Sequence, residues 1–588
     1  MDKSQIDLYS VNQKYYDILS IDSYLNSQNS DFLAQNVKFF EKLIAFSIKF
    51  KESALNSYSS IEELCRNLQF LEKLKFLQLD IDTQLQIIPS SEFFIELGKS
   101  LTHLKDLECL CLSSYVPETI SEQQLNQFKI QLEQLQKLIC INFKFKFVAQ
   151  NSHIFLKEFA NFFQNLQQIE NLNLQFEFQN QLANEINCVI PRVYNLNNLK
   201  QIRISVRDHN NLSISNIQQF QKDLIGLNSL SDLKLSFQIT NTSLTQQLNE
   251  LLNTSLTLKT LEKLNFQILF QKRQEFQFMI GTELTDPTNL SKFKIKLLNS
   301  CHEETKDFQV IFDENIKNLI NLNKLHIEVK FIKMYEHSYH NLGNLLRISK
   351  KLQNLNIISN CDINEDQFIQ FGKTFSNLSS LKQLKLEVMM NKFNQDKYGF
   401  MDGISSLVQL EELELGSLYY FLGENLLDTF SYLVNLQSFS LSSYLKVTNK
   451  DLESFGNSLI YLKSLNNLKI KLPLNHDTQN ISNISSSIGS LLNLKILNIQ
   501  LYDFLFYNFS LDIDHCVQLF KNVSNLSNLI ELNLEFQTKQ EFQQQFENAL
   551  VNSIMNLPKL RKLKANVQQL GLVKIIRKHK RLVILYLI

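Results

Sequence analysis

The feature that most constrains the fold of this chain is a short apolar motif that returns about every 30 residues. The segment 71–81, LEKLKFLQLDI, returns as LTHLKDLECLCL at 101–112 and as LSSLKQLKLEV at 378–388. We take the first residue of each closing L-x-L pair as the anchor of its repeat. The anchors run from Leu77 to Leu563, with a weaker copy near Phe46 and a truncated copy that ends the chain. A repeat kept over this length indicates one stacked architecture, not several globular domains.

Each repeat combines a strand pattern with a helix pattern. Its closing part alternates apolar and polar residues, which is typical of a half-buried strand. The part before it has apolar residues at helical spacing, such as Phe368, Phe371, Phe375 and Leu378. Strands reached through helices run parallel, and one repeat cannot bury its own apolar face. We therefore predict a single solenoid of about 18–19 units at 41–588, after an amino-terminal cap or degenerate first repeat at 1–40.

Small residues recur at one helical position. Gly98, Gly372 and Gly456 each precede the anchor of their repeat by about 12 residues. We expect a residue without a bulky side chain to let the helix lie close against the strand layer.

The L-x-x-L-x-L motif joined to a helix resembles the leucine-rich repeat, and the long helical unit is similar to the ribonuclease-inhibitor class. The resemblance implies an α/β horseshoe with a parallel sheet on the concave face and helices on the convex face. It also implies a binding scaffold. The chain departs from the family in the turn after the strand, where the Asn or Cys expected five residues after the anchor occurs only as Asn360. Most repeats instead place an apolar residue one position earlier, which predicts a longer strand.

Composition narrows the function further. The 588 residues carry 59 Lys and Arg against 59 Asp and Glu, so the chain lacks the global basic excess of an electrostatically driven nucleic-acid binder.

The start of the chain has no signal-peptide pattern, and no apolar run is long enough to span a membrane. We expect a cytoplasmic protein, with the nucleus as the alternative, and no membrane partner. The eight cysteines are scattered except for Cys109 and Cys111, so we expect reduced, buried thiols.

No motif of a catalytic or cofactor site occurs in the sequence. The closest glycines, Gly399 and Gly403, exclude the glycine-rich phosphate loops and the hydrolase elbow. His337 with His340, and the Cys301–Glu304 run, lack a second pair of metal ligands at a suitable spacing. We therefore predict a protein that is not an enzyme, with no cofactor, metal or small-molecule substrate.

The side chains expected on the concave face identify candidate partner-binding residues. In each strand, the positions one before, one after and three after the anchor point away from the helices. These positions predict a basic sector followed by an acidic sector. The basic sector consists of Lys234, Lys263, Lys292, Lys294, Lys296, Lys324 and His326, and the acidic sector consists of Glu328, Glu387, Glu412 and Glu414. The simpler interpretation is a solvated sheet face, and the functional one is a surface for a partner of complementary charge.

The carboxyl terminus offers a second candidate surface. Four cations, Arg577, Lys578, Lys580 and Arg581, precede a final apolar run that has no polar cap. One interpretation is a short last strand whose edge is partly protected, and the other is a strand edge that docks onto another subunit.

Three functions follow from these features. The leading hypothesis is a non-enzymatic protein–protein interaction scaffold, or a structural subunit of a larger assembly, that binds through the concave face or the carboxyl-terminal edge. The alternatives are a regulator of a small GTPase that resembles a GTPase-activating protein, and a nucleoprotein subunit that uses the lysine sector. The neutral charge and the lack of aromatic residues among these lysines disfavour nucleic acid.

Overall fold

The computed structural model describes most of the repeats and few of the loops that follow the strands. The described residues are 18–21, 27–50, 59–81, 91–116, 120–147, 155, 159, 162–178, 192–207, 212–240, 242–271, 276–300, 305–330, 332–334, 336–359, 365–388, 399–416, 425–443, 449–474, 481–503, 513–536, 543–565 and 584–587. The chain forms two compact units. The first unit is Met1–Gln274 with Asn299–Cys301, and the second unit is Glu275–Leu298 with His302–Ile588.

The first unit contains a parallel sheet whose strands follow chain order. Each strand pairs with the next one along the chain. The strands are β1 (Ile18–Ile21), β2 (Ala45–Lys49), β3 (Phe76–Asp80), β4 (Cys109–Tyr115), β5 (Cys140–Phe147), β6 (Asn171–Phe178), β7 (Gln201–Arg207), β8 (Asp232–Ile239) and β9 (Lys263–Phe270).

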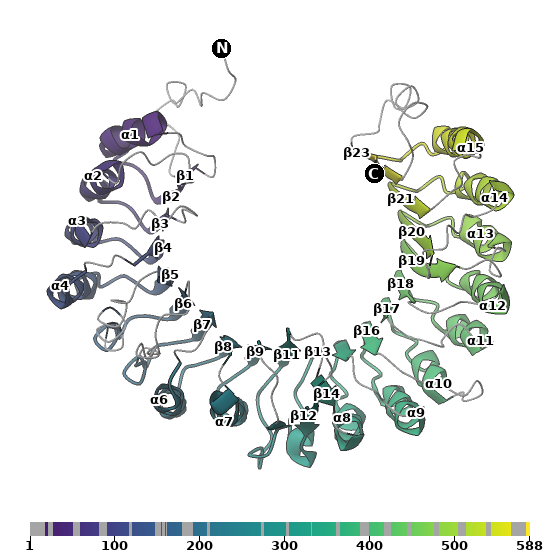
Figure 1. Cartoon of the computed structure of the whole chain (residues 1–588), viewed down its shortest axis with the longest axis horizontal. Coiled ribbons are helices and arrows are strands. Elements are labelled where there is room, and N and C mark those ends of the chain that lie inside the picture. Colours follow the sequence, from purple (N-terminus) through teal and green to yellow (C-terminus); the bar gives the residue numbers. More distant parts are fainter. Residues whose placement is uncertain are drawn as a thin grey trace. The chain divides into compact units, whose positions relative to one another are not determined.

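Helices of the first unit lie on one side of these strands (Figure 1). They are α1 (Ser27–Asn36), α2 (Ser59–Asn67), α3 (Ser91–Leu101), α4 (Glu122–Glu133), α6 (Ile214–Ile225) and α7 (Thr245–Thr257), with short 3-10 turns at Val37–Phe39, Leu68–Phe70 and Thr242–Leu244. Ser121 caps α4 by accepting from Gln124 N while the Gln124 side chain accepts from Ser121 N, which satisfies two amide groups at the helix start.

The second unit repeats this arrangement. Its parallel sheet contains β11 (Lys292–Asn299), β13 (Lys324–Lys330), β15 (Asn354–Ser359), β16 (Gln383–Val388), β17 (Glu412–Gly416), β18 (Ser438–Ser442), β19 (Asn467–Leu474), β20 (Ile496–Asp503), β21 (Glu531–Phe536), β22 (Lys562–Ala565) and β23 (Ile584–Leu587). Its helices are α8 (Glu336–Ile348), α9 (Glu365–Lys373), α10 (Gly399–Ser405), α11 (Asn425–Tyr432), α12 (Asn449–Leu459), α13 (Ser482–Gly489), α14 (Ile513–Val523) and α15 (Gln543–Met555), with 3-10 turns at Glu314–Asn318 and Thr374–Asn377.

The register confirms the phase of the repeat. Anchor residues face one another across neighbouring strands, as Leu77 faces Leu110 and Leu355 faces Leu384. These four side chains are at most 1% exposed. The longer strand is confirmed as well, because the apolar residue four positions after the anchor is buried within a strand in β6, β7 and β8, as Phe176, Val206 and Phe237 respectively. The described repeats therefore have the α/β leucine-rich-repeat architecture expected from the sequence.

One part of the second unit departs from the strand-and-helix unit. Three short strands, β10 (Phe276–Ile280), β12 (Thr305–Phe312) and β14 (Ile332–Met334), form a separate parallel sheet. The prediction of a helix in every repeat is wrong here. The reason lies in the local spacing, since apolar residues alternate at period two in both β10 and β12, which favours a strand over a helix.

Backbone hydrogen bonds at the start of each strand hold consecutive repeats together. The carbonyl oxygen two residues before an anchor accepts from two successive amides of the next repeat. The Lys75 oxygen accepts from Glu108 N at 2.8 Å and Cys109 N at 2.9 Å, and the Gln437 oxygen accepts from Asn466 N at 2.7 Å and Asn467 N at 3.0 Å. The same pattern recurs along both units, so each strand begins at a fixed height on its neighbour.

A ladder of polar side chains lies before the strands. Asn435, Asn493 and Asn528, each four residues before an anchor, donate through Nδ2 to a carbonyl oxygen of the preceding repeat at 2.9 to 3.0 Å. From the sequence we looked for such a ladder five residues after the anchor and did not predict the one four residues before it. The signal was present in the recurring Asn-Leu pair just upstream of the strand motif. Asn360, the family-like position, lies outside the described residues.

The recurring glycines act between helices, not between a helix and the strand layer as we expected. A Cβ atom at Gly372 would lie 2.6 Å from Cα of Phe400, which belongs to α10. A Cβ atom at Gly456 would lie 2.7 Å from the backbone of Asn483 in α13. The missing side chain therefore lets the helices of consecutive repeats touch through their backbones.

This contact predicts that Gly372→Ala destabilises the second unit. The backbone of α10 cannot yield as a flexible side chain would, so we expect a loss of about 1–3 kcal/mol. Gly226→Ala is the matched control, because its nearest new contact would be a 3.5 Å approach to Asp223 O. Urea denaturation measures the loss, and hydrogen exchange should accelerate in α9 and α10. Equal stability of the two variants would contradict the close contact.

Candidate partner-binding face

The strands carry a row of polar side chains on the sheet face opposite the helices, which we call the polar sheet face. It consists of the positions one before, one after and three after each anchor. Lys234 of β8 and Lys263 of β9 lie on it in the first unit, and both are exposed. The other candidate residues of the two predicted sectors lie on it in the second unit. The cluster Arg577–Arg581 lies outside the described residues.

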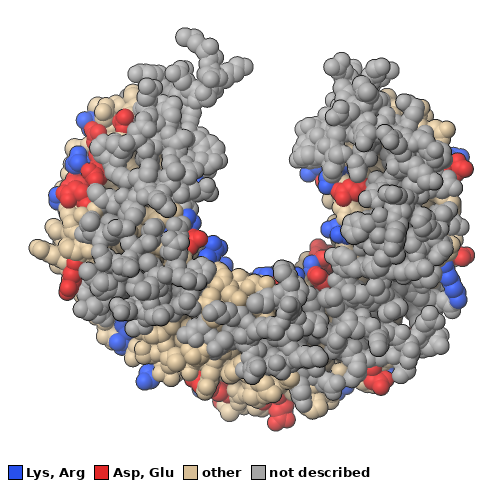
Figure 2. All heavy atoms as spheres, in the orientation of Figure 1, with Lys and Arg blue, Asp and Glu red and all other residues tan. Residues whose placement is uncertain are grey.

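Several lysines of this face are neutralised within the sheet. Lys385 of β16 faces Glu414 of β17, and its Nζ lies 2.6 Å from the carboxylate. Lys562 likewise faces Glu531, at 3.3 Å. Basic and acidic side chains are also interspersed on the described part of the surface seen in Figure 2. Glu414 is therefore a partner of a neighbouring strand, and the predicted acidic sector is partly compensated by the protein itself.

Glu328 of β13 is the most enclosed charge of the face. Its side chain is 10% exposed and is surrounded by Lys296, directly opposite on β11, by His326 Nε2 at 3.4 Å and by Lys330 Nζ at 3.6 Å. The hydrogen bond with His326, together with the hydrogen bond and charge of Lys296, lowers the pKa of Glu328 to about 2, against the opposing effect of burial. The carboxylate thus stays ionised and holds three basic side chains together.

One pair on the same strands lacks such compensation. Lys292 of β11 lies directly opposite Lys324 of β13. Lys294 lies opposite His326, which contacts Glu328. Neither Lys292 nor Lys324 has an ion-pair partner among the described residues. Like charges directly opposite each other destabilise a sheet. The β11/β13 part of the face therefore carries unneutralised positive charge beside one enclosed carboxylate.

The remaining candidates lie outside β11 and β13. In the first unit, Lys234 faces Arg203, a second pair of like charge, and Lys263 faces Asp232, which accepts from Gln201 Nε2 at 2.8 Å. In the second unit, Glu387 faces Gly416, while Glu412 is exposed and faces Ser438.

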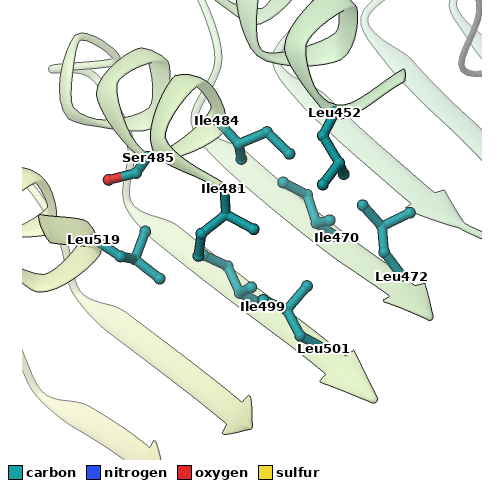
Figure 3. A pocket seen from close by; sticks show the side chains of 9 residues that line it. All are labelled: Leu452, Ile470, Leu472, Ile481, Ile484, Ser485, Ile499, Leu501 and Leu519. Carbon is teal, nitrogen blue, oxygen red and sulfur yellow. The ribbon is translucent and has the colours of Figure 1, made fainter. Parts of the chain in front are cut away.

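An apolar cavity lies between the sheet and the helices of the second unit (Figure 3). Side chains from β19, β20, α12, α13 and α14 line it, including Ile470, Ile499 and Leu519. Its volume of about 10 Å³ is at the lower limit for one water molecule. This cavity is a packing defect of the core and has no room for a ligand.

The possible metal ligands do not converge in the described structure. His337 and His340 are both exposed on α8, and within the described ranges no group of three or more His, Cys, Asp or Glu side chains could hold a metal ion. Cys301–Glu304 lies outside those ranges. Likewise, no helix of the described residues is long and apolar enough to cross a membrane.

Comparisons with known proteins give only weak likenesses. No protein-family model matches the chain, and no curated protein sequence matches it. The internalin inlF from Listeria monocytogenes str. 4b F2365 is 16% identical with a TM-score of 0.36, covering 64% of this chain and 82% of that chain. The Rad7 and Elc1 complex of yeast contains a chain 14% identical with a TM-score of 0.30, covering 71% of this chain and 82% of that chain. Likenesses of this strength carry no argument about function.

The environment of Glu328 predicts a specific dependence of stability on pH. Because its pKa in the folded protein lies near 2, below the ordinary value of 4.5, ionised Glu328 stabilises the fold above about pH 4.5. This contribution is lost as the pH falls towards 2. We expect Glu328→Gln to cost on the order of 1–3 kcal/mol at neutral pH, since it leaves basic groups unpaired.

Urea midpoints measured between pH 7 and about pH 2 test this expectation. The Glu328→Gln protein should lose less stability over the acid range than the unmodified protein does. Glu412→Gln is the control, because it removes an exposed carboxylate of the same face. Identical acid profiles for Glu328→Gln and the unmodified protein would refute the role of Glu328.

Proposed function

We propose that this protein is a non-enzymatic interaction scaffold that binds an acidic segment of a partner protein on the β11/β13 part of its polar sheet face. The observation that carries this proposal is the uncompensated Lys292–Lys324 pair. Elsewhere on the face, Lys385 and Lys562 each face a glutamate across the strand boundary. A carboxylate from a partner would supply the negative charge that Lys292 and Lys324 lack within the protein.

The energetic argument concerns the cost of like charge. The backbones of adjacent strands lie about 5 Å apart. The ammonium groups of two facing lysines therefore repel each other, which destabilises the free protein slightly. A bound carboxylate placed between them removes the repulsion and adds two ion pairs. Exposed pairs of this kind contribute less than about 1 kcal/mol each, so they determine orientation and association rate more than affinity.

A protein partner fits this face better than nucleic acid does. Glu328 lies in the middle of the basic residues and Glu412 lies on the same face of the unit. Both carboxylates would repel a phosphate backbone, and the polar positions of β11 and β13 carry no aromatic side chain for base stacking. A partner with carboxylates opposite the lysines and cations opposite the glutamates matches both signs. Regulation of a small GTPase has no comparable support from any described residue.

The carboxyl-terminal edge stays a prediction. The last strand, β23, pairs in parallel with β22, and Leu585 faces Leu563. The basic cluster before it lies outside the described residues, so docking at that edge rests on the sequence alone.

The β11/β13 proposal predicts charge-specific binding. We expect the full-length protein to bind a fluorescent oligo-glutamate peptide, measured by anisotropy, with an affinity that falls as salt rises. Lys292→Gln combined with Lys324→Gln should weaken this binding about tenfold, which corresponds to about 1.4 kcal/mol. An oligo-glutamine peptide should not bind.

The control variant combines Lys382→Gln with Lys385→Gln. It removes the same charge from the same unit, but both lysines are already paired, with Glu411 and Glu414. Its affinity should match the unmodified protein. An equal loss in both variants would show unspecific attraction and contradict the proposal. Tighter binding of a single-stranded oligonucleotide that depends on Lys292 and Lys324 would favour the nucleoprotein alternative instead.

A further inference from the structure

Strands β4 and β5 are neighbours in the first unit (Figure 1). Three free thiols lie on their polar sheet face. Cys109 and Cys111 lie on β4, with their sulfur atoms 3.9 Å apart. Cys140 lies on β5 directly opposite Cys109, and the two thiols share a hydrogen bond. All three are half-buried, whereas Cys65 and Cys516 are fully buried. The expectation of buried thiols is therefore wrong for this cluster. Side chains of a strand point alternately to its two faces, and these three point away from the core.

The surroundings favour the ionised form of two of these thiols. The thiol of Cys109 donates to its neighbours, which raises its own pKa. The hydrogen bond between Cys109 and Cys140 lowers the pKa of Cys140 to about 7, with a smaller contribution from the charge of Arg203. Burial of Cys140 acts in the opposite direction. The pKa of Cys111 is also lowered, chiefly by Cys109. The hydrogen bond from Cys109 therefore favours the thiolate form of Cys140.

We propose that Cys140 and Cys109 form a redox-sensitive pair that hydrogen peroxide converts to a disulfide between β4 and β5. An accessible, ionised cysteine beside a resolving cysteine is the arrangement expected of such a pair. Residues directly opposite on adjacent strands are about 4.8 Å apart, within the range of about 4.4–6.8 Å that joins the Cα atoms of disulfides. Cys109 and Cys111, two apart along one strand, are separated by about 6.6 Å, near the outer limit.

The reaction proceeds in two balanced steps. The Cys140 thiolate attacks one oxygen of hydrogen peroxide, the O–O bond breaks, and Cys140 becomes a sulfenic acid as hydroxide leaves. The Cys109 sulfur then attacks the Cys140 sulfur, and the S–O bond breaks. The departing hydroxide and the Cys109 proton form water. Two thiols lose two electrons in total, and the peroxide is reduced to two molecules of water.

A disulfide at this place would link two consecutive repeats on the polar sheet face. Facing residues of parallel strands do not reach the preferred Cβ–Cβ spacing of about 3.8 Å without a small shift, so the bond is strained and readily reduced. The link is therefore reversible. It would alter the face of the first unit and leave the β11/β13 lysines of the second unit chemically unchanged.

The test uses the reduced full-length protein, freed of metal with a chelator and exposed to a small excess of hydrogen peroxide. Peptide mapping under non-reducing conditions should find Cys109 joined to Cys140, at a rate that rises with pH through about 7. Cys140→Ser should abolish the disulfide. In Cys109→Ser, dimedone should trap the sulfenic acid on Cys140. Cys111→Ser should still form the bond.

Buried cysteines provide internal controls in the same map. Burial raises the pKa of Cys65, and its side chain is 0% exposed, so it should stay reduced, as should the equally buried Cys516. Cys65→Ser should oxidise at Cys140 like the unmodified protein. Oxidation of Cys65 as fast as Cys140 would overturn the proposal. So would a disulfide that requires Cys111, or unreacted Cys109 and Cys140 in the folded unmodified protein.

Discussion

The structure depends on the backbone hydrogen bonds that fix where each strand begins on the one before it. The Ile139 oxygen, for example, accepts from Glu170 N at 2.9 Å and from Asn171 N at 3.0 Å. A slip of one residue would move every apolar side chain of a strand to the other face. One carbonyl group that binds two amides makes such a slip costly in each repeat where this pattern occurs. The buried anchors and the straight rows of polar residues follow from this register.

The same register determines the chemistry of the polar sheet face. Residues about one repeat apart in sequence become direct neighbours in space, as Lys385 and Glu414 do across β16 and β17. No local motif encodes such a pair. A thiol cluster, a compensated ion pair and a repulsive lysine pair all arise from which residue types occupy equivalent positions of adjacent repeats. The side-chain pairs of this face therefore join equivalent positions of adjacent repeats, and a search for motifs that are continuous in sequence does not detect them.

This explains how far the sequence could predict the molecule. Periodicity was enough for the parallel strands, the buried anchors and the polar positions, because these follow from the two periods of strand and helix. It failed at β10 and β12, where the local period changed. It also could not assign the partner of Lys296 or the proximity of Cys140 to Cys109. Those facts require the register between strands and the direction of each side chain, which a one-dimensional pattern does not contain.

A stacked fold also explains how uncompensated charge can persist on one part of the face. Each repeat contacts mainly its neighbours, so the repulsion between Lys292 and Lys324 is a local cost that the other strands do not share. Glu328, only four residues after Lys324, moderates that cost by neutralising Lys296. The formal net charge of zero is thus the sum of positive and negative charges that are unevenly distributed among the strands. Neutrality of the whole chain is therefore compatible with local charges of opposite sign on individual strands.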